Sequence, residues 1–490
     1  MLFRSRSAGC NHVVARPNCA CCSAEVTQLT QRVNHDLTRR GFVAGASASV
    51  ALLGLAAYSG PVRAQEAGAP VTAVTNVNLF NGMDSDLKVG VTVVVQGGMV
   101  ADIVTGDFTP PEGATVIDGA GRTLMPGLID AHWHTMIAAL PIQALLSLAE
   151  GDIHFAAAKQ AERTLMRGFT TVRDMGGPAF ALKRAIDGGI VAGPRIYPSG
   201  ALISQTSGHG DFRNIWELPG VPGTLSRAEV LNAAALADGR DAVLKATREQ
   251  LMQGASQIKL VAGGGIASVY DPIDVTEFLP EELEAAVLAA ADWGTYVSAH
   301  VYTATGIQRC LKAGVKSIEH GQLADEDSVK MMADMGAVWS LQPFVKDLHA
   351  NPDALPPERR EKWEAVWEGT DRAYELAAKY KVPLGFGTDF LFDPVGAELQ
   401  NVWLAAMTRW YTPAGAAKAA TSDNAFILGM SGPRNPYTAG KLGVIEKGAY
   451  ADMLIVDGDP TADFGFVADP DANFRVIMKG GTVYKNTLGA

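Results

Sequence analysis

The stretch LMPGLIDAHWH at residues 124–134 decides the fold class of this chain. It is an apolar run that ends in an aspartate and two histidines, and comparable apolar runs recur as far as residue 389. Between these runs lie segments rich in Ala, Leu, Glu and Lys, a composition that is typical of helices. Strands that alternate with helices in this way predict βα repeats around a parallel sheet.

Eight apolar runs predict eight strands: LMPGLIDAH (124–132), FTTVRD (169–174), RIYPSG (195–200), QIKLVAG (257–263), TYVSAH (295–300), VKSIEH (315–320), AVWSLQP (337–343) and VPLGFGTD (382–389). Eight such strands indicate an α/β protein with a (β/α)8 TIM barrel. Short β-branched runs precede residue 120 and return after residue 440. We therefore expect a small β-sandwich formed from both chain ends; an independent C-terminal domain is the alternative.

The predicted domains are a leader (1–64), the N-terminal strands of the β-sandwich (65–122), a TIM barrel (123–428) and the C-terminal strands of the β-sandwich (429–490). The leader contains the pair Arg39-Arg40, a weakly apolar run over residues 44–58 and small residues before Gln65. This pattern is typical of a twin-arginine signal peptide, and the run is shorter than the roughly 20 residues of a membrane helix. We expect export to the periplasm or the medium, without a stable membrane span.

Composition excludes several classes of protein. The chain has 490 residues, of which 48% are hydrophobic and 19% charged, a balance typical of globular proteins rather than of disordered chains. A formal net charge of -11 opposes binding to nucleic acid phosphates. Four of the five cysteines lie within residues 1–22, so the globular part, with Cys310 alone, contains no internal disulfide.

Polar residues at the carboxyl ends of barrel strands are the ones expected to carry chemistry. His132 and His134 project to the same side of an extended chain because they are two residues apart. The fifth, sixth and eighth predicted strands end in His300, His320 and Asp389. A single histidine is more often a hydrogen-bonded core residue, but imidazoles and a carboxylate on converging strands are typical of a zinc-like site.

Lys259 interrupts an otherwise apolar strand, where a charged ammonium group is costly to bury. Burial lowers a lysine pKa, and a neutral amine can add carbon dioxide to become a carbamate that bridges two cations. A lysine that reaches the barrel mouth, or that pairs with Asp389, is the alternative.

The ordered motifs LMPGLIDAHWH, Lys259, His300, IEHG (318–321) and GTDF (387–390) resemble the amidohydrolase superfamily, in particular its binuclear, carbamylated-lysine members. Within it, the chain is most similar to the imidazolonepropionase-related group that includes Xaa-Pro dipeptidases and ochratoxin-hydrolysing amidases. True imidazolonepropionases are mononuclear and lack the lysine, so Lys259 is evidence against that activity.

The resemblance implies two divalent metal ions, which we expect to be zinc. By this likeness one ion is held by His132, His134 and Asp389, the second by His300 and His320, and both by the carbamate of Lys259. It further implies that a metal-bridging hydroxide attacks the scissile carbonyl, while Asp389 carries the proton to the leaving amine.

Tyr302 and the loop ISQTSGHGDFRN (203–214) are the candidate substrate contacts. The resemblance assigns His209 and Tyr302 to the substrate carboxylate and carbonyl, and we add Arg213 as a further cation. Tyr302 as core packing, or His209 as an isolated histidine, are the alternatives. We expect the tryptophans Trp339, Trp363, Trp367 and Trp403 to fill the core rather than line a pocket.

These observations predict a metal-dependent amide hydrolase that cleaves the C-terminal amide bond of dipeptides or N-acyl amino acids, including ochratoxin-like amides. The substrate is expected to be small and to carry a free carboxylate. A lactonase or cyclic-amide hydrolase using the same site is one alternative, and a non-catalytic periplasmic binding protein is another. The oligomeric state, including a homo-oligomer, is left open.

Overall fold

The computed structural model describes residues 70–489 apart from 219, 221–222, 269 and 349–355, and these residues belong to one compact unit. The predicted leader, with its twin arginine and its cysteines, lies outside the described residues and stays a prediction. Among the helices of the described chain, none has the length and hydropathy that a bilayer span requires.

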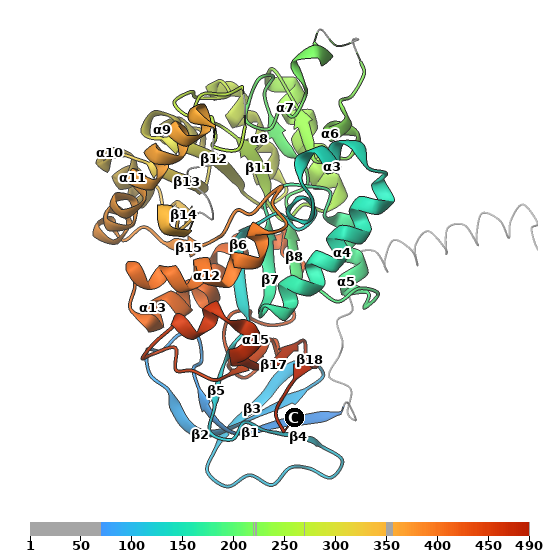
Figure 1. The fold of residues 1–490 in the computed structure, drawn as a ribbon, viewed down its shortest axis with the longest axis vertical. Coiled ribbons are helices and arrows are strands. Elements are labelled where there is room, and N and C mark those ends of the chain that lie inside the picture. Colours follow the sequence, from blue (N-terminus) through green and yellow to red (C-terminus); the bar gives the residue numbers. More distant parts are fainter. Residues whose placement is uncertain (1–69, 219, 221–222, 269, 349–355, 490) are drawn as a thin grey trace, which may run out of the picture. The chain divides into compact units, whose positions relative to one another are not determined.

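Eight parallel strands follow one another in chain order, each at a predicted position: β6 (Leu128–Trp133), β7 (Phe169–Asp174), β8 (Arg195–Pro198), β11 (Ile258–Val261), β12 (Val297–Thr303), β13 (Ser317–Leu323), β14 (Val338–Leu341) and β15 (Leu384–Phe386). Helices separate most of them: α4 (Glu150–Met166), α5 (Phe180–Asp187), α7 (Arg240–Gln253), α8 (Pro280–Asp292), α9 (Ala304–Ala313), α10 (Glu326–Asp334) and α11 (Pro357–Tyr380). The helices surround the strands (Figure 1), which makes the fold TIM-barrel-like.

The hydrogen-bonded ladders of these strands form two sheets. One has the order β6-β7-β8, and the other has the order β10-β9-β11-β12-β13-β14-β15. Strands β9 (Leu202–Ser204) and β10 (Ala234–Leu236), each three residues long, were not predicted. Amide side chains bridge the two sheets: Gln257 donates to Asp174 O and Tyr197 O, and Asn424 donates to Ile129 O and Phe386 O.

A third sheet combines the two ends of the described chain, as predicted (Figure 1). Its eight strands are β1 (Val71–Leu79), β2 (Lys88–Gln96), β3 (Met99–Thr105), β4 (Thr115–Asp118), β5 (Thr123–Pro126), β16 (Met453–Val456), β17 (Phe474–Lys479) and β18 (Thr482–Asn486). Hydrogen bonds between β5 and β16 join the N-terminal and C-terminal halves. The strands thus form one continuous sheet rather than the two separate sheets of a sandwich.

The prediction of a single strand over residues 124–132 was wrong. The chain leaves the end sheet after Pro126 and enters the barrel-like sheet at Leu128, so the run divides between β5 and β6. Gly127 at the junction packs against Thr170, and a Cβ at this position would lie 2.2 Å from the Thr170 Oγ1. The proline and the close packing together explain why the apolar run serves two sheets.

Several strands pass directly into capped helices, which fixes where their carboxyl ends lie. Thr303 ends β12 and its side chain accepts a hydrogen bond from Gly306 N at the start of α9. Asp325 caps α10 two residues after β13, by accepting from Ser328 N. Such N-caps typically contribute about 1 kcal/mol each. The strands that carry His300 and His320 therefore each lead into a capped helix start.

Candidate functional site

Three of the predicted metal-site residues form a compact group at the carboxyl ends of β6 and β15. The His132 Nε2 and the His134 Nε2 lie 3.0 and 3.1 Å from the Asp389 Oδ1. One potential ligand atom from each residue lies within 4.8 Å of the others. A hydrogen bond from Asp389 N to His132 O ties the two strand ends together. Two imidazoles and one carboxylate in this arrangement are a donor set suited to a divalent cation.

The other three predicted ligands surround this group. The Lys259 Nζ lies 3.4 Å from the His132 Nε2. The His320 ring centroid is 4.9 Å from that of His132 and 4.3 Å from that of His300. The structure therefore brings all six predicted residues together, and each of the five basic ones is at most 4% exposed.

Outer hydrogen bonds orient the histidines. The His132 Nδ1 lies 2.8 Å from the Glu319 Oε2, and the His320 Nδ1 lies 2.8 Å from the Gln342 Oε1. Both acceptors leave Nε2 as the nitrogen that faces the cluster. The buried His320 Nε2 has no hydrogen-bond partner among the described residues. A buried ring nitrogen without a partner fits a metal ligand, because buried polar atoms are otherwise paired.

Glu319 is itself held by a buried network. Its carboxylate accepts from Arg173 at 2.8 and 2.9 Å, and from the hydroxyls of Ser298 and Ser317 at 2.6 Å each. Burial alone would raise its pKa, but Arg173 and His132 hold the pKa of Glu319 well below its usual range. The acceptor of His132 is therefore a carboxylate anion, which favours the tautomer with Nδ1 protonated.

Two of the cluster residues have left-handed backbone conformations. His320 has φ 70° and Asp389 has φ 58°. Residues other than glycine rarely adopt such angles, and when they do the strained residue is commonly functional. Asp389 lies in the turn after β15, and His320 lies within β13, directly before an irregularity in the pairing of β13 with β12.

The protonation states suit cation binding. Burial lowers the pKa of Lys259 to about 8, although the nearby carboxylates of Glu319 and Asp389 oppose this shift. Burial also lowers the pKa values of His300 and His320 well below the usual value. Burial disfavours the Asp389 anion, but the neighbouring histidines nevertheless hold the pKa of Asp389 well below its usual range. Neutral imidazoles, an anionic carboxylate and a readily neutralised amine are therefore all present.

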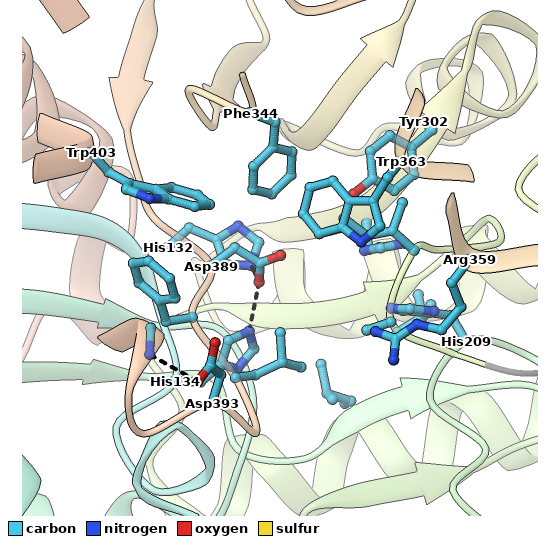
Figure 2. Close-up of a pocket in the computed structure, with 18 of the residues that line it drawn as sticks. His132, His134, His209, Tyr302, Phe344, Arg359, Trp363, Asp389, Asp393 and Trp403 are labelled. Carbon is cyan, nitrogen blue, oxygen red and sulfur yellow. Dashed lines mark hydrogen bonds and ion pairs between the residues drawn. The ribbon is translucent and has the colours of Figure 1, made fainter. Parts of the chain in front are cut away.

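A cavity of about 220 Å³ opens above the cluster and contains the predicted substrate contacts Tyr302 and His209. The Tyr302 hydroxyl is buried without a hydrogen-bond partner among the described residues, and its ring stacks on His320 at 5.0 Å. His209 stacks on His300 at 4.3 Å. Figure 2 shows Asp389 at the centre of this cavity, with Phe344, Trp363 and Trp403 above the cluster.

The position of His209 depends on two buried carboxylates from a distant loop. Its backbone N–H donates to the Glu277 Oε1 at 2.9 Å, and its Nδ1 lies 3.2 Å from the Asp271 Oδ2. The Ser268 Oγ is 2.7 Å from the same ring nitrogen. With Nδ1 engaged, the Nε2 of His209 is the nitrogen left for a ligand. Burial raises the pKa of Glu277 to about 8.

The structure does not place Arg213 in the cavity. Its Nε and Nη2 donate to the Asp211 carboxylate at 2.8 and 2.5 Å, and the residue is not among those that line the pocket. A local partner two residues away satisfies the guanidinium, so this element of the substrate prediction was wrong. Arg359 at the start of α11 lines the cavity instead.

The expectation for the tryptophans was only partly correct. Trp339 is fully buried and donates to His320 O, which makes it a core residue. Trp363 and Trp403, however, line the cavity, and both contact Phe344, with ring centroids 5.3 and 5.5 Å apart. Sequence reasoning also missed Glu319, although it directly precedes a predicted ligand, and missed Gln342 and Arg359, for which no local signal exists.

Comparison with known proteins agrees with this geometry. The sequence pattern of the amidohydrolase family matches residues 123–484. The ochratoxinase of Aspergillus niger is 33% identical over 381 residues, which cover 74% of this chain and 75% of that protein. A crystal structure of a prolidase complexed with N-methylphosphonate-L-proline has 33% identity and a TM-score of 0.77, covering 85% of this chain and 100% of that one.

A further crystal structure, of a Xaa-Pro dipeptidase with methionine bound in its active site, has 27% identity and a TM-score of 0.73 over the same share of each chain. The family match spans the strands that carry the cluster and the C-terminal strands of the end sheet. Fold, buried ligand set and sequence similarity converge, and the chain belongs to the amidohydrolase family.

Proposed function

We propose that this protein is a metal-dependent amide hydrolase that cleaves the C-terminal amide bond of dipeptides or N-acyl amino acids. The observation that carries the proposal is the group His132, His134 and Asp389 at the floor of a largely apolar cavity, with the unpartnered Tyr302 hydroxyl in the same cavity. In this proposal the eight parallel strands close into a barrel, so that all six ligands meet at one end.

The donor set supports two divalent ions, which we take to be zinc. His132, His134 and Asp389 would hold one ion, and His300 and His320 the other. Lys259, with its pKa lowered to about 8, supports a carbamate between them because a neutral amine is the form that adds carbon dioxide. When bound, such ions polarise a carbonyl and make a water molecule nucleophilic at neutral pH.

Asp389 is suited to move the proton during hydrolysis. Its carboxylate is ionised, and its Oδ1 lies between His132 and His134. As a base it accepts a proton from the attacking water. As an acid it then delivers that proton to the nitrogen of the leaving amine, which must be protonated before the amide bond breaks.

Tyr302 and His209 are suited to bind the substrate around this reaction. The Tyr302 hydroxyl stays protonated, because burial raises its pKa well above the usual value. It can therefore donate a hydrogen bond to the carbonyl oxygen as negative charge develops there. The Nε2 of His209 faces the same cavity and binds a polar group of the substrate. The names of the relatives, prolidase, Xaa-Pro dipeptidase and ochratoxinase, support an amide substrate.

The test is a substrate comparison on zinc-loaded protein. We expect hydrolysis of Xaa-Pro dipeptides and of N-acyl-phenylalanine, with at least a tenfold lower kcat/KM for the corresponding C-terminal amides, which lack the carboxylate. Faster turnover of a lactone than of any peptide would instead indicate a lactonase. Tight binding of dipeptides without turnover, at full metal content, would indicate a binding protein.

A further inference from the structure

We infer that Arg359 binds the free carboxylate of the substrate. It thereby determines which part of the substrate is released as the amine. This inference rests on the proposed function and names the residue that selects the substrate class. Arg359 is the third residue of α11, and its side chain lines the cavity above the cluster. Its Nε is buried without a hydrogen-bond partner in the described region of the chain. A buried guanidinium nitrogen without a partner fits an anion that arrives with the ligand.

The other nearby cations are already engaged. Lys259 belongs to the metal cluster, and Arg213 is paired with Asp211 outside the cavity. The Lys362 Nζ, one helical turn beyond Arg359, donates to three backbone carbonyls: those of Gly265, Ser268 and Asp271, at 3.0, 3.2 and 2.7 Å. Among the described residues that line the cavity, Arg359 is thus the cation left for a ligand.

The contacts of Lys362 also fix where Arg359 lies. Residues three apart on a helix share a face, so the Lys362 contacts hold the same face of α11 against Gly265, Ser268 and Asp271. Asp271 also contacts the His209 ring. Figure 2 shows the Arg359 side chain reaching into the cavity on the side of His209, away from Trp403. The cationic end of the cavity is therefore next to His209, and the opposite end, near Trp403, is aromatic.

This polarity predicts how a substrate binds. A planar guanidinium forms two parallel hydrogen bonds with a carboxylate, and aromatic side chains that line the same cavity, such as Phe344 and Trp363, strengthen that interaction by limiting access of water. With the carboxylate at Arg359, the acyl group extends toward Phe390 and Trp403, whose ring centroids are 4.6 Å apart. The substrate class is then a carboxylate-bearing amine acylated by a bulky apolar group.

Kinetics on matched variants test the assignment. Arg359→Gln should lower kcat/KM for N-acyl-phenylalanine by about 10- to 100-fold while changing that for N-acyl-phenylalaninamide less than about threefold. Arg359→Lys, which keeps the charge but not the planar fork, should recover some of the loss. Arg213→Gln removes the same charge outside the cavity and should leave the preference for acid over amide unchanged. Equal losses for acid and amide in Arg359→Gln would overturn the inference.

A binding measurement separates this inference from the proposed reaction. By calorimetry, the zinc-loaded protein should bind L-phenylalanine at least tenfold more tightly than L-phenylalaninamide, and Arg359→Gln should abolish this difference. If the difference depends on Arg359 but no amide is hydrolysed, the carboxylate site stands and the proposed function fails. If amides are hydrolysed but acid and amide bind equally, the proposed function stands and Arg359 is not the anchor.

Discussion

The cavity has two walls that are built in different ways. The wall of metal ligands comes from the strands β6, β11, β12 and β13 and from the turn after β15. The opposite wall comes from loops and the start of α11, which contribute His209 and Arg359. Ligands on the strand wall are held by buried hydrogen bonds such as that between His132 and Glu319, whereas His209 depends on segments about 60 residues away in sequence.

Because the two walls are built differently, we expect each to control a different property of the protein. The side chains of the strand wall are buried and hydrogen-bonded around the candidate metal site, so changes there should alter metal content and the rate of the chemical step. The loop wall contacts the substrate beyond the scissile bond, so changes there should alter which substrates are accepted. Variants on the two walls can test this division, and the largest effects are expected on the strand wall.

Lys259→Ala should cause the largest loss. We expect the wild-type protein, produced with zinc and bicarbonate, to contain two ions per chain and the variant to lose most of them, with hydrolysis falling below detection. The reason is that the variant removes the bridging carboxylate of the proposed carbamate. Metal analysis measures the outcome, and added formate should restore some of the activity by replacing the missing carboxylate. A variant that retains both ions would remove the carbamate from the proposal.

Tyr302→Phe should lower kcat by on the order of 100-fold, because one donor to the developing oxyanion is lost. KM should change little, since the hydrogen bond strengthens only in the transition state. Metal content should stay at the wild-type value, which separates the effect from that of Lys259. Tyr302 would be a core residue if the variant lost stability but kept its kcat.

Glu319→Gln should weaken metal binding by about 10- to 100-fold, because the acceptor that orients His132 loses its charge. Gln342→Met, which removes the acceptor of His320 without changing the charge, should show a smaller effect of the same kind. Competition with a chelator measures both affinities. The Tm of each variant must be recorded beside it, since Glu319→Gln also leaves Arg173 without its ionic partner. Unchanged affinity in both variants would mean that these residues support the fold alone.

Glu277→Gln should produce the smallest effect, a change in how stability depends on pH. The pKa of Glu277 is about 8 in the folded protein and close to 4.5 when unfolded, so between these values the folded state binds the extra proton. Stability from this group is present at low pH and is lost as pH rises through 8. The variant keeps the acceptor for His209 N but cannot titrate, so its Tm should vary less between pH 5 and 8. The raised pKa of Glu277 would be contradicted if the wild-type Tm rose between pH 5 and 8 and the Tm of the variant rose less.

The two walls also differ in how far the sequence predicted them. The ligands His132, His134, His300 and His320 follow from strand periodicity, because each lies at or near the end of an apolar run. Lys259 was recognisable for the same reason, as a charge within such a run. The local alternation of apolar and polar residues is therefore enough to identify the ligands of the strand wall.

The loop wall was predicted only in part: the family resemblance pointed to His209, but no local pattern reports the contacts of Arg359. Arg213 and Arg359 are equally plausible cations in the sequence, and the difference between them is that Asp211 pairs with the first. The short strands β9 and β10 and the division of residues 124–132 between two sheets have the same cause. Each depends on a partner far away in the chain: Ala234 pairs with Leu202, and Leu124 pairs with Ile455.

The left-handed backbone of His320 and Asp389 has a consequence for the evolution of this chain. An L-residue in this conformation costs about 1–2 kcal/mol relative to its ordinary geometry, and glycine would adopt it with little strain. Selection for stability alone would therefore favour residues that relieve this strain, and the ligands would not be retained. An engineer who screens random variants for heat resistance, without also screening for turnover, should recover inactive proteins with substitutions at these two positions.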